Sequence, residues 1–267
     1  YVSLLAVAAE AMRTSDPQCQ VIAGIGNGPL KLTREVLEAG CLKHADIFNL
    51  HIYPGTRLPE GYAAERDGLL KLMDAHGGRK PIWVTEFSYY GADDLPRRPF
   101  VPVPWSWADN RLLENERQCS DYTIRFFTVM LARGVRKIFI HSGASGAANE
   151  PNFECALFGQ GGEPRRLFPA LAVFTELLGG APQCAGERTI GEAGHAVAFE
   201  TGTQAVAVVW TEDEGAAAKM SVPADAVCLD AMGRKAAGEF TLSTSPGYVV
   251  GPAGKAKELL EQVAGGR

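Results

Sequence analysis

The sequence repeats one pattern along residues 1–180: a short apolar strand, a loop rich in glycine or proline, and an amphipathic helix. After a leading helix at 2–13, strands are predicted at 19–25, 46–52, 81–87 and 137–141. Helices are predicted to follow them at 31–39, 62–76, 114–133 and 168–178. Strands that alternate with helices and are largely apolar on both faces are typical of a parallel sheet covered by helices. We therefore expect an α/β fold, either half of a barrel or a small doubly wound sheet.

The pattern changes after the run Gly179-Gly180-Ala181-Pro182. From residue 195 to 251 apolar and polar residues alternate, and Gly, Asp and Pro separate the runs. This period of two indicates a small antiparallel sheet or sandwich. We expect a partial barrel at 1–181, a β-domain at 182–253, and a helix or tail at 254–267.

Composition excludes several classes of function. The formal net charge is −5 over 267 residues, with no basic stripe, which argues against nucleic acid and anionic membranes as partners. No apolar run approaches the roughly 20 residues that span a bilayer. The six cysteines are scattered, without metal-ligand spacing, so we expect no metal site. The compartment is left open, because the chain begins at Tyr1 rather than Met.

Glu86 is the candidate catalytic residue. It ends the apolar strand Pro81-Ile82-Trp83-Val84-Thr85-Glu86-Phe87, just before a long loop. Regular alternation would place Ile82, Val84 and Glu86 on the barrel's interior face, and Trp83 on the opposite face against a helix. Glu86 would then emerge at the C-terminal rim, where such barrels carry their active sites. An exposed strand-end glutamate or a core ion pair is the alternative.

Two further strands end in polar rings. Asn49, His51 and Tyr53 alternate onto one face of the preceding strand, and His141 ends the following one. An imidazole or phenol beside a carboxylate can orient it and favour its ionised form by hydrogen bonding. Alternatively, the histidines are core residues whose hydrogen bonds are satisfied, and Tyr53 only packs in the core.

Aromatic residues after Glu86 are candidate ligand-binding residues. Tyr89 and Tyr90 follow closely, and Trp105 and Trp107 lie in the loop that comes next. Binding sites commonly combine aromatic side chains with a few polar groups. The alternative is that these rings pack the loop onto the barrel.

The order of these motifs resembles clan A of the glycoside hydrolases, in particular β-xylosidase-like family 39 or family 5. The resemblance covers nearly the whole chain. It is carried by the strand ending Trp83-Val84-Thr85-Glu86-Phe87 and the preceding His51-Ile52-Tyr53-Pro54. Further landmarks are Glu116–Tyr122, Gly134–Ile140, Gly162-Glu163-Pro164-Arg165, Phe168-Pro169-Ala170-Leu171, Asp230-Ala231-Met232-Gly233 and Pro246–Val250.

The resemblance implies strands 5–8 of a (β/α)8 TIM barrel followed by a β-sandwich, and a retaining glycosidase that needs no cofactor. Glu86 would be the nucleophile, and His51, Tyr53, Tyr89, Trp105, Trp107 and His141 would bind the carbohydrate. The second carboxylate, the acid/base, belongs to an Asn-Glu motif after the fourth strand. It is therefore expected upstream of Tyr1, and this chain alone is expected to be nearly inactive.

Three features of the sequence allow competing interpretations. The run Asn149-Glu150-Pro151-Asn152 spells the acid/base motif but follows the last barrel strand, so we interpret it as a coincidence. A noncatalytic carbohydrate-binding or scaffold protein with a degenerate barrel would lack the Asn-Glu pair altogether. A nucleotide-binding enzyme would need a phosphate loop, and the run at 24–28 lacks the required spacing.

Overall fold

The computed structural model describes residues 1–24, 31–91, 112–141, 156–159, 162–216, 218–236 and 239–265. They form two compact units through which the chain passes more than once. The first unit comprises Tyr1–Tyr53, Gly61–Ser88 and Arg133–His141. The second comprises Pro54–Glu60, Tyr89–Ala132 and Ser142–Arg267.

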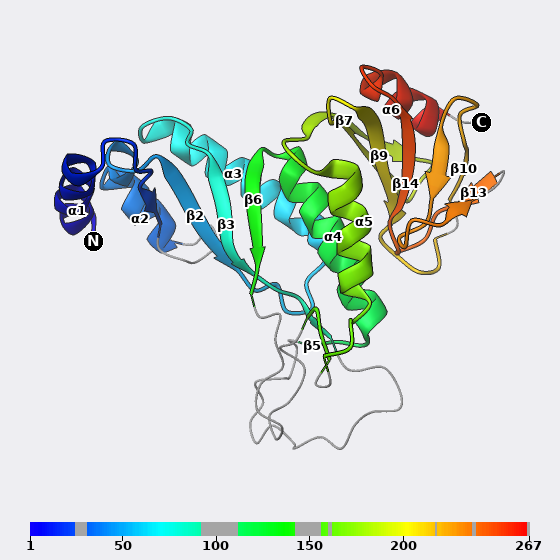
Figure 1. The fold of residues 1–267 in the computed structure, drawn as a ribbon, viewed down its shortest axis with the longest axis horizontal. Coiled ribbons are helices and arrows are strands. Elements are labelled where there is room, and N and C mark those ends of the chain that lie inside the picture. The colour runs from blue at the N-terminus through cyan, green and yellow to red at the C-terminus, as the bar shows by residue number, and fades with distance from the viewer. Residues whose placement is uncertain are drawn as a thin grey trace. The chain divides into compact units, whose positions relative to one another are not determined.

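The first unit is built on a parallel sheet, as the sequence predicted. Its strands are β1 (Ile22–Ala23), β2 (Ile47–Ile52), β3 (Ile82–Phe87) and β6 (Val135–Ile140), paired in that order. In Figure 1, β2, β3 and β6 run side by side with their C-terminal ends at the same edge. The unit's helices are α1 (Val2–Ser15), α2 (Lys31–Glu38) and α3 (Tyr62–Ala75).

The predicted helices and strands lie within a few residues of the observed ones, with one exception. The strand predicted at 19–25 is reduced to the two residues of β1. Glycine sets one boundary clearly: α2 is followed by Gly40 at φ 87°, a left-handed conformation that β-carbon contacts disfavour in other residues. A 3-10 turn, Cys41–Lys43, then leads toward β2.

The two faces of this sheet differ in burial, contrary to the expectation of strands covered on both sides. One face is fully buried and apolar: Phe48, Leu50, Ile52, Ile82, Val84 and Phe87. On the other face, Asn49 and His51 of β2 and Trp83 and Glu86 of β3 are only partly buried, and Phe139 of β6 is exposed. Polar side chains on this second face remain partly accessible to solvent.

The second unit contains two helices and an antiparallel sheet. Helix α4 (Glu116–Ala132) is buried along most of its length and packs against α5 (Leu167–Leu178), where Phe127 and Phe174 meet with ring centroids 5.9 Å apart. Two short strands, β4 (Tyr90–Gly91) and β5 (Leu112–Leu113), pair in parallel beside α4.

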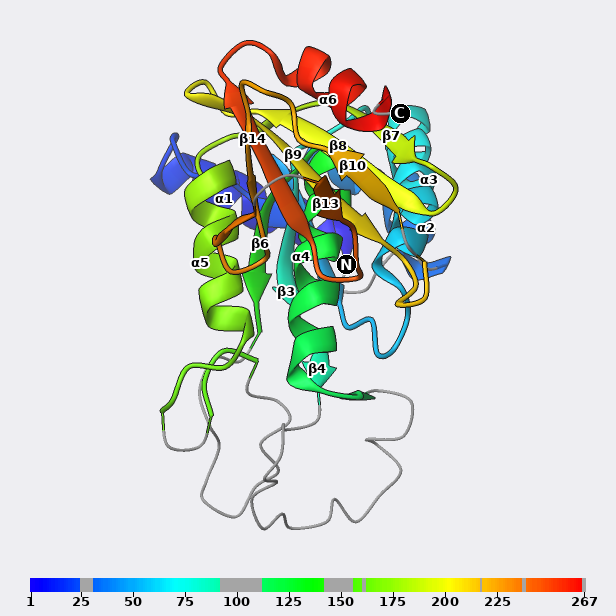
Figure 2. The ribbon, with the colours of Figure 1, turned by 90° about the vertical axis from the view of Figure 1, so that its right-hand side faces the viewer.

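The antiparallel sheet confirms the period-two prediction. Its order is β12 (Lys235–Ala236), β11 (Val227–Leu229), β14 (Gly247–Pro252), β9 (Gln204–Thr211), β8 (Gly194–Glu200), β7 (Gln183–Ile190). A separate ribbon pairs β10 (Lys219–Ser221) with β13 (Glu239–Thr241). Figure 2 shows the final helix, α6 (Ala256–Gly265), lying across one face of the sheet.

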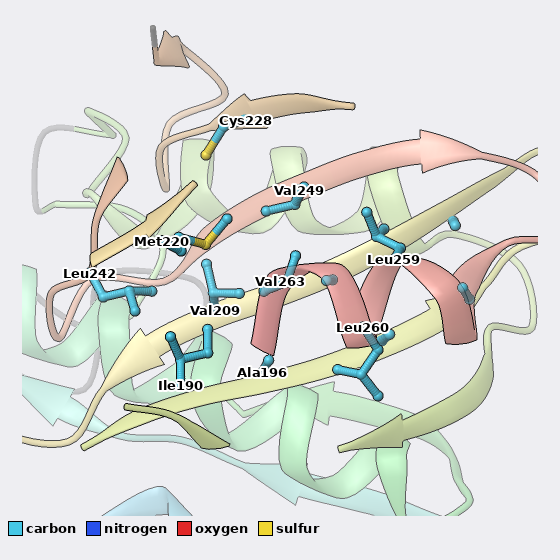
Figure 3. Packing of buried hydrophobic residues seen from close by; sticks show 14 residues of the cluster. Ile190, Ala196, Val209, Met220, Cys228, Leu242, Val249, Leu259, Leu260 and Val263 are labelled. Atoms are coloured by element: carbon cyan, nitrogen blue, oxygen red, sulfur yellow. The ribbon is translucent and has the colours of Figure 1, made fainter. Parts of the chain in front are cut away.

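The apolar core between α6 and this sheet explains the terminal helix. Leu259, Leu260 and Val263 project from α6 onto Ala196, Val209 and Val249 of the strands (Figure 3). Each buried leucine contributes about 1.5–3 kcal/mol relative to an exposed one. The alanines on the strands leave room for the larger helix side chains.

The units do not coincide with the predicted division at residue 181, because α4 and α5 cluster with the antiparallel sheet. The division into 1–181, 182–253 and 254–267 therefore stays a prediction. Within the described ranges, every helix is too short or too polar to span a bilayer.

Gly24→Ala is expected to destabilise the first unit. An added Cβ would overlap the side-chain oxygen of Asn49 and lie 2.5 Å from its backbone oxygen. We expect a loss of about 1–3 kcal/mol in the free energy of unfolding, measured by urea denaturation. The matched control is Gly68→Ala in α3, where nothing lies within 4 Å of the new Cβ. The control should gain roughly 0.5–1 kcal/mol. Equal stability of the two variants would contradict this packing.

Candidate active site

Glu86 lies at the C-terminal end of β3, where two side chains from the end of β2 converge on it. The Tyr53 hydroxyl donates to Glu86 Oε2 at 2.6 Å, and His51 Nδ1 lies 3.1 Å from the same oxygen. The Glu86 side chain remains 38% exposed and that of His51 30% exposed. This carboxylate is therefore held by two groups and still accessible, which a structural core ion pair would not require.

A β-bulge at Thr85 sets the direction of Glu86. In the pairing of β2 with β3, Asn49 lies opposite Trp83 and His51 lies opposite Glu86. One residue separates Asn49 from His51 in β2, but two residues separate Trp83 from Glu86 in β3, so β3 contains one extra residue. The sequence prediction that Glu86 shares a face with Ile82 and Val84 is therefore wrong. Regular alternation was assumed, and the bulge reverses it by one residue.

The prediction for Trp83 is wrong because of the same bulge. It lies on the Glu86 face rather than against a helix, and it contacts β6. The Lys137 ammonium lies 4.3 Å from the Trp83 ring centroid, and the Phe139 ring 5.9 Å from it. Trp83 and Lys137 thus form a layer of the sheet face that lies nearer the N-terminal ends of the strands than Glu86 does.

A hydrogen bond ties the bulge to the neighbouring strand. Asn49 Nδ2 donates to Thr85 Oγ1 at 2.9 Å. Neither residue was named as a site residue from the sequence. The signal was present, however, because Asn49 shares the alternation of His51 and Tyr53, and Thr85 directly precedes Glu86.

His141 joins this group from the end of β6. Its ring packs edge-on against Tyr53, with centroids 5.6 Å apart and an interplanar angle of 83°. Its backbone N–H donates to the carbonyl of Phe87 at 2.8 Å, which keeps the strand ends in register. The structure therefore brings His51, Tyr53, Glu86 and His141 together in one unit.

Tyr89 occupies a different environment. It is 0% exposed, its hydroxyl donates to the carbonyl of Arg57 at 2.6 Å, and Tyr122 and Phe126 pack edge-on against its ring. In this structure neither ring face is open to a sugar. Trp105, Trp107 and the run Asn149-Glu150-Pro151-Asn152 lie outside the described residues.

Glu86 is the sole carboxylate within the four strands of the parallel sheet. Across the described ranges, no cluster of His, Cys, Asp or Glu has the arrangement of a metal site. Two surface hollows of about 250 and 380 Å³ are lined by other residues, around α4 and between α2 and α3. We give them no role, because the hydrogen-bonded carboxylate lies elsewhere.

The arrangement suits a carboxylate that acts on a bound molecule. The Tyr53 hydroxyl donates to Oε2, and His51 Nδ1 lies near the same oxygen. An ionised carboxylate so oriented can act as a nucleophile or as an acceptor toward a hydroxyl-rich ligand.

Comparison with known proteins shows that the chain is similar in fold to solved structures of glycoside hydrolases. No family model matches, and no curated protein matches by sequence. Among solved structures, a β-porphyranase of glycoside hydrolase family 86 from Bacteroides plebeius matches with a TM-score of 0.61 at 12% identity. A glucosidase from Croceicoccus marinus matches with a TM-score of 0.59 at 13% identity. A family 86 protein in complex with neoagarooctaose matches at 0.56 and 14%.

Coverage is asymmetric in all three cases. The matches span 96%, 92% and 92% of this chain but 52%, 63% and 46% of the other chains, in the same order. The chain thus spans about half to two-thirds of the length of these structures. Identities of 12–14% establish a similarity of fold and nothing finer.

A double-mutant cycle tests the link between the bulge and β2. Asn49→Ala and Thr85→Ala each remove one partner of the 2.9 Å hydrogen bond. Their effects on the free energy of unfolding should be non-additive by about 0.5–1.5 kcal/mol. A cycle that pairs Asn49→Ala with Lys257→Ala, on the exposed side of α6, provides the additive control. Strict additivity in the first cycle would disprove the link.

Proposed function

We propose that this chain carries the nucleophile of a retaining glycoside hydrolase, and that Glu86 is that nucleophile. The observation that carries the proposal is that the Tyr53 hydroxyl donates to Glu86 Oε2 while His51 Nδ1 lies 3.1 Å from the same oxygen, at a strand end where the Glu86 side chain is 38% exposed. The glycoside hydrolase fold of the solved structures supports the class of reaction. Half of a (β/α)8 barrel, strands 5–8, followed by a β-sandwich is the architecture we propose for the chain.

In the proposed mechanism, Glu86 attacks the anomeric carbon and forms a glycosyl-enzyme, which water then hydrolyses. The Tyr53 hydrogen bond and the nearby His51 ring act on Oε2 and fix the orientation of the carboxylate before attack, and Oε1 forms the new bond. We assign no metal or cofactor to this reaction.

The acid/base that protonates the leaving oxygen would come from outside this sequence. Glu86 cannot serve both roles, because one carboxylate cannot attack and transfer the proton in the same step. We propose an Asn-Glu motif after the fourth barrel strand, upstream of Tyr1, as in clan A. The isolated chain would then be nearly inactive on unactivated glycosides.

The proposed substrate is an oligo- or polysaccharide, or a glycoside. One of the similar structures is a complex with neoagarooctaose. His51, Tyr53 and His141 surround Glu86 and would contact the sugar nearest the cleaved bond. Trp105 and Trp107 are proposed as stacking platforms.

Covalent trapping tests Glu86 directly. A 2,4-dinitrophenyl 2-deoxy-2-fluoroglycoside has a leaving group that needs no protonation, so the acid/base is dispensable for the first step. A panel of gluco, galacto and xylo reagents should label the protein once, and peptide mass spectrometry should place the label on Glu86. Glu86→Gln should abolish labelling, whereas Glu200→Gln, a strand-end glutamate of β8, should not.

Activity of the full-length protein gives the second readout of this experiment. Glu86→Gln should lower kcat by at least about 1,000-fold and leave the thermal unfolding curve unchanged. Hydrolysis at the wild-type rate by that variant would remove Glu86 from the mechanism. Sugar binding by the wild type without any labelling or turnover would favour the noncatalytic carbohydrate-binding alternative.

Tyr53→Phe should slow the reaction without weakening substrate binding. The change removes only the hydroxyl that donates to Glu86 Oε2. Hydrogen bonds to charged groups are worth about 1.5–3 kcal/mol, so kcat should fall roughly 10- to 100-fold while KM changes little. Steady-state kinetics on an aryl glycoside separate the two constants. A rise in KM at constant kcat would instead make Tyr53 a binding residue.

A further inference from the structure

The chain leaves the first unit immediately after Tyr53 and again two residues after Glu86. Pro54–Glu60 and Tyr89–Ala132 both cluster with the second unit. The segment Pro54–Glu60 directly follows the phenol that holds Glu86, so whatever fixes this segment restricts where Tyr53 can lie. Two partly buried contacts within the second unit hold it.

The first contact joins the segments that follow β2 and β3. Tyr89, three residues after Glu86, donates its hydroxyl to the carbonyl of Arg57, four residues after Tyr53, at 2.6 Å. The backbone of Tyr89 is itself held, because the Cys119 thiol donates to its carbonyl at 3.2 Å. Burial raises the pKa of Cys119 to about 12, with Glu116 and Asp121 adding to the rise, so this thiol stays protonated and able to donate.

The second contact is a buried ion pair at the end of the same segment. Arg125 of α4 is 0% exposed and donates to Glu60 through Nε at 2.8 Å and through Nη2 at 2.7 Å. Trp210 of β9, also buried, donates its indole N–H to Glu60 Oε1 at 2.8 Å. A bidentate pair with a third donor has little freedom to shift, because each direction of movement breaks a charge-assisted bond.

Tyr122 links the two contacts. The Arg125 guanidinium lies over the Tyr122 ring, 4.9 Å from its centroid, and Tyr122 packs edge-on against Tyr89. The segment 54–60 is thus anchored at Arg57 and at Glu60 by one connected set of side chains. We call Tyr89, Arg125, Glu60 and Trp210 the brace.

We propose that the brace positions Tyr53 against Glu86, and that Tyr89 acts as a positioning residue rather than as a sugar platform. This rests on the proposed function for its catalytic consequence. The brace touches no substrate: its members are buried or nearly so and act through the backbone of residues 54–60.

The test uses Tyr89→Phe, which removes only the hydroxyl that bonds Arg57. Tyr248→Phe is the matched control, since Tyr248 is equally buried in the second unit and the described residues offer its hydroxyl no partner. Tyr53 is replaced by 3-fluorotyrosine in full-length protein, and its ¹⁹F signal is recorded. A shift on Glu86→Gln first establishes that the signal reports the Tyr53–Glu86 hydrogen bond.

We expect the ¹⁹F signal to move or broaden in Tyr89→Phe and to stay unchanged in Tyr248→Phe. A second variant, Trp210→Phe, should act in the same direction as Tyr89→Phe. An unchanged signal in both brace variants would overturn the proposal, whatever their thermal stability. This readout needs no substrate, so it decides the role of the brace even if no glycoside is hydrolysed and the proposed function fails.

Kinetics add the catalytic consequence. On an aryl glycoside, Tyr89→Phe should lower kcat about 10-fold with little change in KM, because small displacements of positioned groups slow chemistry more than binding. Tyr248→Phe should keep the wild-type kcat. A moved ¹⁹F signal with unchanged kcat would overturn the catalytic consequence of the brace.

Discussion

The hydrogen bond from Tyr53 to Glu86 is the interaction on which the functional interpretation depends. It requires two strand ends in register, a face of the sheet that is not covered, and a carboxylate turned onto that face. The sheet pairing supplies the register, and the bulge at Thr85 supplies the turn. Without the extra residue, Glu86 would share the buried apolar face with Val84, where an ionised carboxylate is costly unless it is paired.

The bulge also explains which residues of β3 lie on the buried face and which on the partly exposed face. Ile82, Val84 and Phe87 are buried, although Val84 and Phe87 are separated by an odd number of positions. A regular strand cannot bury both on one face. The bulge resolves this conflict, and the Asn49–Thr85 hydrogen bond holds it in place from the neighbouring strand. Bulges of this kind commonly re-aim a side chain beside an active site.

A second constraint runs through the connections between the two units. The segments that follow Tyr53 and Ser88 leave the parallel sheet and are fixed among residues of the second unit. Breaking a buried bidentate ion pair leaves an uncompensated charge, so Glu60 and Arg125 constrain each other strongly. The end of the segment that follows Tyr53 is therefore held by side chains of helix α4 and strand β9.

The sequence by itself determined the order of strands and helices, the change from a parallel to an antiparallel sheet, and the placing of His51, Tyr53, Glu86 and His141 at strand ends. These follow from local periodicity, which a single sequence carries. Only the tertiary structure decided that Trp83 faces Lys137 and that Glu86 turns to the open face. It alone showed that Tyr89 is buried and that Arg125 pairs with Glu60 and Trp210. These features depend on one inserted residue in a strand pairing and on contacts between residues 32 to 150 positions apart, and periodicity records neither.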